Sequence, residues 1–94
     1  MFGAKKNVLI IEHEAIIALD IKKRFEKEGH NVVGISSSFR ETLGNIRNYK
    51  NVDLILLDSG LSDFNHRMPL AEKIYSFFNT PLILLVSNID SNFR

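Results

Sequence analysis

The sequence predicts an α/β protein built on a doubly wound parallel sheet, with helices on both faces. Short apolar runs alternate with longer segments of helical period, in the order strand, helix, strand, helix, strand, helix, strand. The apolar runs are continuous instead of alternating with polar residues, which is typical of strands covered on both faces. Alternation of this kind requires crossovers between parallel strands. The 94 residues are expected to form a single domain, 1–94.

Four segments are predicted strands. Residues 8–11 are apolar throughout, and residues 31–35 form a second short run. Residues 53–58 place an acid at each end of four Leu and Ile residues. The fourth strand, 82–86, follows a Thr-Pro pair that ends the preceding helix.

Three segments are predicted helices. Residues 14–28 have apolar side chains at helical spacing, and Gly29 follows where a helix needs a left-handed residue to end. Residues 39–49 come after an S-x-x-E capping box that starts at Ser38. Residues 68–79 form the third helix, with a proline tolerated in the first turn.

Charge and composition exclude several classes of function. Twelve Lys and Arg against eleven Asp and Glu give a net charge of +1, so no basic excess exists for nucleic-acid binding. No apolar run approaches the ~20 residues that a membrane-spanning helix needs. The N-terminus has no hydrophobic signal core, so a cytoplasmic protein without a membrane partner is expected. The absence of cysteine excludes disulfides and thiolate metal sites.

The chemistry is expected at the carboxyl ends of the strands, where functional groups of parallel sheets collect. Asp58 is the most informative residue, because it ends a strand of Leu and Ile and is held at the lip of the sheet. A carboxylate there can act as a nucleophile toward a phosphoryl donor or ligate a hard cation. Glu12 and Glu14 follow the neighbouring strand. From position alone, a loop-capping role for Asp58 and a helix-start role for Glu14 stay open.

Three runs carry a resemblance to a known family: Val-Leu-Ile-Ile-Glu-His-Glu at 8–14, Asp-Leu-Ile-Leu-Leu-Asp at 53–58 and Thr-Pro-Leu-Ile-Leu-Leu-Val-Ser at 80–87. In this order and spacing they resemble the receiver domain of two-component response regulators. The resemblance extends from about Lys6 to Asn88, nearly the whole chain. It implies the flavodoxin-like receiver fold, with four strands predicted here and the fifth strand and last helix missing from the 94 residues.

The resemblance implies a function in phosphorelay signal transduction. Asp58 falls on the phosphoacceptor position, which takes a phosphoryl group from a histidine kinase or a phosphotransfer protein. Mg²⁺ is the implied cofactor, held by Glu12, by Asp58 and by the backbone carbonyl of Gly60. The chain would then be a signalling domain with at most self-catalysed phosphoryl transfer, and an output domain or effector protein would be its downstream partner.

The chain departs from the receiver pattern at three places. His13 replaces the second metal-binding acid, although Mg²⁺ prefers anionic oxygen. Val86 stands where a Ser or Thr hydroxyl contacts the phosphoryl group, and Ser87 is the candidate substitute. No Lys-bearing fifth strand follows within the 94 residues. These departures leave open an alternative, a pseudo-receiver that is not phosphorylated and acts as a protein–protein interaction module.

Other interpretations of the histidines stay open as well. Glu12, His13 and Asp58 could hold a transition metal, since imidazole and carboxylates suit Zn, Fe or Mn. A small metal-dependent hydrolase is the corresponding enzyme class. His30 and His66 are expected to be solvated, in a turn and a loop.

The chain is also expected to self-associate. Residues 82–86 would form an apolar edge strand without a charge to discourage pairing with another chain. Ile16 and Leu19 lie away from the apolar face of the first predicted helix, as if a second partner covered them.

Overall fold

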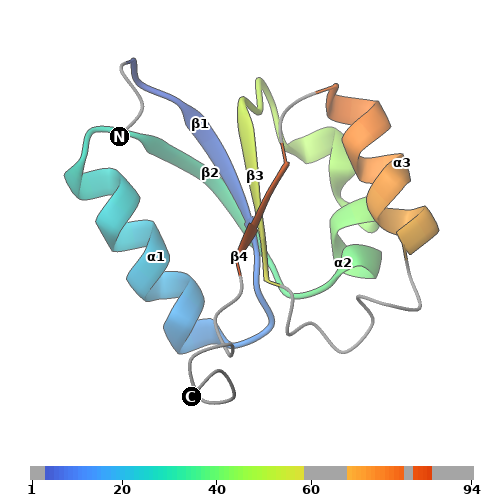
Figure 1. The fold of residues 1–94 in the computed structure, drawn as a ribbon, viewed down its shortest axis with the longest axis horizontal. Helices are drawn as coiled ribbons and strands as arrows, with labels where there is room; N and C mark the ends of the chain where they lie inside the picture. The colour runs from blue at the N-terminus through green and yellow to red at the C-terminus, as the bar shows by residue number, and fades with distance from the viewer. Residues whose placement is uncertain (1–3, 59–67, 80–81, 86–94) are drawn as a thin grey trace.

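The computed structural model describes residues 4–58, 68–79 and 82–85, in which strands and helices alternate (Figure 1). The elements are β1 (Asn7–Ile11), α1 (Ala15–Lys27), β2 (Asn31–Ser36), α2 (Phe39–Gly44), the 3₁₀ turn η1 (Ile46–Asn48), β3 (Leu54–Asp58), α3 (Met68–Phe78) and β4 (Leu82–Leu85).

The four strands form one parallel sheet in the order β2-β1-β3-β4. Figure 1 shows α1 against one face of this sheet and α2 and α3 against the other. The predicted α/β fold and its four strands are therefore confirmed. None of the helices in the described part of the chain has both the length and the apolar character needed to cross a membrane.

The continuous apolar runs of β1 and β3 are explained by burial on both faces. Successive side chains of a strand point to opposite faces, so each strand supplies two cores. The core beneath α2 and α3 contains Leu9, Ile11, Phe39, Val52, Ile55, Leu57 and Ile74. The core beneath α1 contains Val8, Ile10, Ala18, Leu54 and Leu56. Each fully buried Leu or Ile contributes about 1.5–3 kcal/mol, so these two central strands account for most of the hydrophobic stabilisation.

The helix predicted over residues 39–49 is shorter than expected. α2 ends at Gly44, and after Asn45 the chain continues as the 3₁₀ turn η1. Glycine is about 1 kcal/mol less favourable than alanine inside a helix. Gly44 also has no side chain that could pack on the sheet, and no atom lies within 4 Å of where a Cβ would be. The regular helix therefore ends there.

His30 is buried, so the prediction of a solvated His30 was wrong. Gly29 adopts φ +93° after α1 and turns the chain back beneath the helix. The imidazole consequently lies 5.8 Å from the ring of Phe25, measured between centroids, and its Nδ1 accepts a hydrogen bond from the backbone N–H of Lys6 at 3.0 Å. His30 thus ties the start of β2 to the segment that enters β1. His66 lies outside the described residues.

The hydrogen bond to His30 predicts a specific loss of stability. His30→Phe keeps a ring against Phe25 but removes the acceptor for the Lys6 N–H, and a buried donor without an acceptor costs about 1–3 kcal/mol. We expect a lower urea midpoint for this variant. Tyr75→Phe is the control, because Tyr75 is exposed on α3 and surface changes stay within about 0.5 kcal/mol. Equal midpoints for His30→Phe and the wild type would contradict the structural role.

Candidate functional site

The sheet places Glu12 and Asp58 next to each other. Ile11 at the end of β1 is paired with Leu57 of β3, so Glu12 and Asp58 are the next residues on two neighbouring parallel strands. Such strands lie about 4.8 Å apart. The backbone N–H of Glu12 also donates to the carbonyl of Ser36 at 2.8 Å, which fixes the exit of β1 against β2. The carboxyl ends of three strands therefore meet at Glu12.

The carboxylate of Glu12 is held in place by the loop that leads into α1. Its side chain is only 1% exposed, and its Oε2 accepts a hydrogen bond from the backbone N–H of Glu14 at 3.0 Å. Burial of a carboxylate is costly unless hydrogen bonds or cations compensate. Glu12 is thus a buried carboxyl group that is held in one orientation next to the end of β3. Glu14 is exposed and contributes its backbone rather than its carboxylate to this arrangement.

His13 lies at the rim of this site. Its Nδ1 is 3.9 Å from Oε2 of Glu12, and 48% of its side chain is exposed. This distance allows an ion pair with Glu12 when the imidazole is protonated. A carboxylate at position 13 would instead repel Glu12. His13 can therefore offset the charge of Glu12 from the solvent side.

For several predicted site residues, the side chain or the whole residue lies outside the described part of the structure. The backbone of Asp58 is paired with Leu85 of β4, whereas its side chain and the whole of Gly60, Val86 and Ser87 lie outside the described residues. Among the side chains that are described, no three His, Asp or Glu gather closely enough to hold a metal ion. A metal set built on Glu12 and His13 would need Asp58 as well, and this set stays a prediction.

A cluster of polar side chains lies at the end of β2, and the sequence analysis did not predict that these side chains contact one another. Ser36 and Thr42 are both completely buried, and Thr42 Oγ1 lies 2.7 Å from Ser36 Oγ and donates to the carbonyl of Ser38 at 2.7 Å. The capping box is only half realised. Ser38 Oγ accepts from the N–H of Glu41 at 3.0 Å, but the Glu41 carboxylate accepts from the N–H and hydroxyl of Ser37 instead of from Ser38.

Tyr49 joins this cluster from the far end of α2 and η1. A Cβ at Gly34 would lie 2.5 Å from Cε1 of Tyr49, so the absence of a side chain at position 34 makes room for the ring on β2. Burial raises the pKa of the Tyr49 phenol, a hydrogen bond with Ser36 acts to lower it, and the charge of Glu41 raises it. The glycine in β2, which is unfavourable in a strand, was the signal in the sequence for such a close approach.

Comparisons with known proteins agree with this fold. No family model matches the chain. The phyllosphere-induced regulator PhyR of Methylorubrum extorquens is 31% identical over 80 residues, which cover 85% of this chain and 30% of that protein. The PhyR response regulator REC domain of Erythrobacter litoralis superposes with a TM-score of 0.73 at 25% identity, over 90% of this chain and 65% of that one. The chain has the fold of the response-regulator receiver domains, and its sequence is similar to that of PhyR.

Two further solved structures are similar to this chain. PhyR of Brucella abortus gives a TM-score of 0.72 at 30% identity, covering 86% of this chain and 33% of that one. A response regulator of Thermotoga maritima shares the fold, with a TM-score of 0.68 at 20% identity over 95% of this chain and 76% of that one. The three structures are named as response regulators. The chain spans about a third of the length of the curated PhyR relative.

The contacts of Glu41 predict how stability depends on pH. Hydrogen bonds from the Ser37 backbone N–H and hydroxyl lower the pKa of Glu41. A lowered pKa in the folded chain means that ionised Glu41 contributes stability above its unfolded pKa of about 4.3, and that this contribution is lost as the pH falls through the folded value. Glu41→Gln removes the titrating group, so stability should decline less steeply in this variant between about pH 5 and pH 3.

Urea unfolding of the wild type and Glu41→Gln at a series of pH values checks this expectation. Glu26→Gln, the same change at an exposed position of α1, is the control and should follow the wild type. Curves of equal slope for the wild type and Glu41→Gln would show that the Ser37 contacts do not stabilise the ionised form in solution.

Proposed function

We propose that this receiver domain accepts a phosphoryl group on Asp58 and that phosphorylation controls its contact with a partner protein. The observation that supports the proposal most directly is the β1–β3 register, which makes Asp58 and Glu12 neighbouring backbone positions on adjacent strands, with the Glu12 side chain buried. In the transfer, a carboxylate oxygen of Asp58 forms the new bond to phosphorus. The bond from phosphorus to the donor breaks, and the donor leaves with that electron pair.

Mg²⁺ is the proposed cofactor of this reaction. Carboxylate and carbonyl oxygens are the ligands it prefers, so Glu12, Asp58 and the carbonyl of Gly60 would hold it, while the imidazole of His13 suits it poorly. When bound, the ion would neutralise charge between the carboxylate and the phosphoryl oxygens. The residues of the chain itself keep the acids in place: Glu14 orients Glu12 through its N–H, and β3 carries Asp58 to the same edge.

A histidine kinase or a phosphotransfer protein is the proposed phosphoryl donor, and an output domain or effector protein the proposed target. One relative, PhyR of Bartonella quintana, is described as an anti-anti-sigma factor and has been solved in complex with the anti-sigma factor NepR. That structure is 31% identical, and the receiver domain covers 36% of its chain. We propose that the present domain likewise serves a regulator whose output is a protein–protein contact.

A second candidate function is that of a pseudo-receiver, which binds a partner without being phosphorylated. The observation in its favour is the surroundings of Glu12, whose Oε2 caps the loop into α1 and lies 3.9 Å from an imidazole instead of a second acid. Such an arrangement can stabilise the fold without any metal. Reactivity of Asp58 separates the two candidates.

Phosphodonor chemistry tests the leading proposal. With acetyl phosphate and Mg²⁺, we expect slow modification of the wild type by mass spectrometry, and none of Asp58→Asn. His13→Asp should accelerate the reaction about tenfold or more, because a restored acid strengthens the metal site and changes around metal ligands are typically worth 10–100-fold. Beryllofluoride binding followed by NMR should show the same order.

Three outcomes would contradict the phosphoryl-transfer proposal or its metal argument. Modification that persists in Asp58→Asn would place the reactive group elsewhere. No reaction of either the wild type or His13→Asp, in chains that keep a native NMR spectrum, would favour the pseudo-receiver. Fast stoichiometric reaction of the wild type without acceleration in His13→Asp would show that His13 does not limit Mg²⁺ binding.

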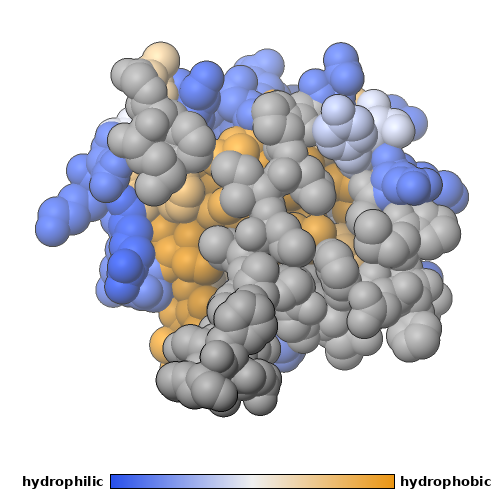
Figure 2. All heavy atoms as spheres, in the orientation of Figure 1, coloured by the Kyte–Doolittle hydropathy of each residue, from blue (hydrophilic) through white to orange (hydrophobic). Residues whose placement is uncertain are grey.

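Self-association is the remaining partner proposal, and α1 is the proposed contact. Ile16 is 84% exposed and Leu19 is 49% exposed, which is unusual for large aliphatic side chains on one helix. Figure 2 shows a hydrophilic surface over most of the outer side of α1 and an apolar surface inward of it, over the sheet. Two copies related by a two-fold axis would bury the same patch on each.

Sedimentation at micromolar concentration tests the contact through α1. We expect a dimer for the wild type and a dissociation constant at least about tenfold weaker for Ile16→Glu, because a charge would be buried in the apolar contact. Tyr75→Glu, which changes a similarly exposed residue on α3, is the matched control and should leave the dimer intact. A monomeric wild type would overturn the proposal.

A further inference from the structure

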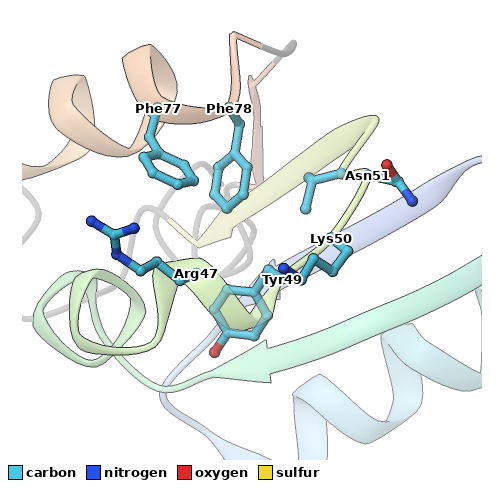
Figure 3. Close-up of a pocket in the computed structure, with 7 residues that line it drawn as sticks. Arg47, Tyr49, Lys50, Asn51, Phe77 and Phe78 are labelled. Atoms are coloured by element: carbon cyan, nitrogen blue, oxygen red, sulfur yellow. The ribbon is translucent and has the colours of Figure 1, made fainter.

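A groove lies at the amino edge of the sheet, opposite the end that carries Glu12 and Asp58. Its volume is about 370 Å³ (Figure 3). One wall is the segment that runs from η1 toward β3, and the other is the end of α3. The lining residues are Arg47, Tyr49, Lys50, Asn51, Val52, Phe77 and Phe78.

The charges of this groove have one sign. Arg47 and Lys50 are both exposed, and no acid is among the lining residues in the described part of the chain. Asp53, which follows in the chain, is turned toward β1, where its carboxylate accepts a hydrogen bond from the N–H of Asn7 at 2.9 Å. The two cations are therefore left without a carboxylate from the groove itself, and the groove favours an anionic ligand.

The apolar part of the groove offers an anchoring point. Phe77 is 53% exposed and packs edge-to-face on Phe78 at 5.2 Å. Figure 3 shows both rings on the side of the groove that faces Arg47 and Tyr49. Val52 is buried, and Phe78 packs against the same core, so the floor is rigid. An exposed aromatic ring above a rigid apolar floor is typical of the sites at which a side chain of a partner is buried.

The shape of the groove favours an extended ligand over a compact one. A second hollow, of about 530 Å³, is lined in part by the same residues, Lys50 and Asn51. A third, of about 260 Å³, shares Arg47 with the groove. Arg47 and Lys50 are the charged residues among the described lining of these three neighbouring hollows. A linear chain with several carboxylates matches this arrangement better than a mononucleotide, which would occupy one hollow.

We propose that this groove binds a short acidic peptide segment of a partner protein. Carboxylates of the segment pair with Arg47 and Lys50, the guanidinium of Arg47 being suited to bidentate contact. An apolar side chain of the segment packs against Phe77 and Phe78. The site is separate from the edge at which Asp58 would be phosphorylated, so a peptide held here leaves that edge free.

An NMR titration of the ¹⁵N-labelled full chain tests the proposal. The probe is a blocked pentapeptide of sequence DEFED, and two further peptides serve as controls: NQFQN, which lacks the charges, and DEGED, which lacks the anchor. We expect shift changes for residues 47–52 and 77–79 with DEFED and much weaker binding of both controls. The affinity should also fall with added salt, because the contacts are partly exposed ion pairs.

Variants of the chain separate a groove contact from a general attraction to cations. Arg47→Gln with Lys50→Gln should weaken DEFED binding about tenfold, in line with two partly exposed ion pairs. Phe77→Ala should weaken it several-fold. The matched control is Lys23→Gln with Lys27→Gln, which removes the same charge from α1 and should leave the affinity unchanged.

Three results would overturn the proposal. The first is no shift change at millimolar DEFED. The second is equal weakening by the two double variants, which would mean that net charge rather than the groove attracts the peptide. The third is binding of AMP at residues 47–52 when DEFED does not bind, which would assign the groove to a compact nucleotide. Asp58→Asn should bind DEFED as the wild type does, so this test is independent of the phosphoryl-transfer proposal.

Discussion

The pairing of β1 with both β2 and β3 is the constraint on which the rest of the molecule depends. In the described sheet, β1 and β3 are the two central strands, and each has a hydrogen-bonded neighbour on both sides. The register of β1 with β3 sets which side chains enter each core, because a slip by one residue would exchange the two faces. The same register brings the ends of β1 and β3 level. The packing of the protein and the position of its acidic edge are therefore fixed by one set of backbone hydrogen bonds.

Much of the fold could be predicted because its signals are local. Continuous apolar runs identified the strands, and Gly29 identified the end of α1, where it adopts the left-handed conformation that a glycine permits. The order of elements then determined a parallel sheet, and with it the edge at which Glu12 and Asp58 meet. Each of these inferences needs only neighbouring residues and the general rules of α/β folds.

The features that sequence reasoning missed depend on contacts between distant segments. His30 is buried because its acceptor nitrogen meets the N–H of Lys6, 24 residues away. Tyr49 covers Gly34, and the groove combines the segment before β3 with the end of α3. Hydrophobic periodicity and motif spacing do not predict such contacts, because they show which side of a helix or strand is apolar but not which segment packs against it. The roles of Gly60, Val86 and Ser87 stay predictions for a different reason, as they lie outside the described residues.

The position of Tyr49 has a spectroscopic consequence. The chain contains no tryptophan and two tyrosines, so its near-ultraviolet absorption and intrinsic fluorescence come mainly from Tyr49 and Tyr75. Tyr75 is exposed on α3, whereas the Tyr49 ring lies on β2, with its backbone in the groove wall and its hydroxyl hydrogen-bonded to Ser36. Because burial raises the pKa of Tyr49, the ultraviolet change that accompanies ionisation of its phenol is an intrinsic optical probe of the contact between this ring and β2.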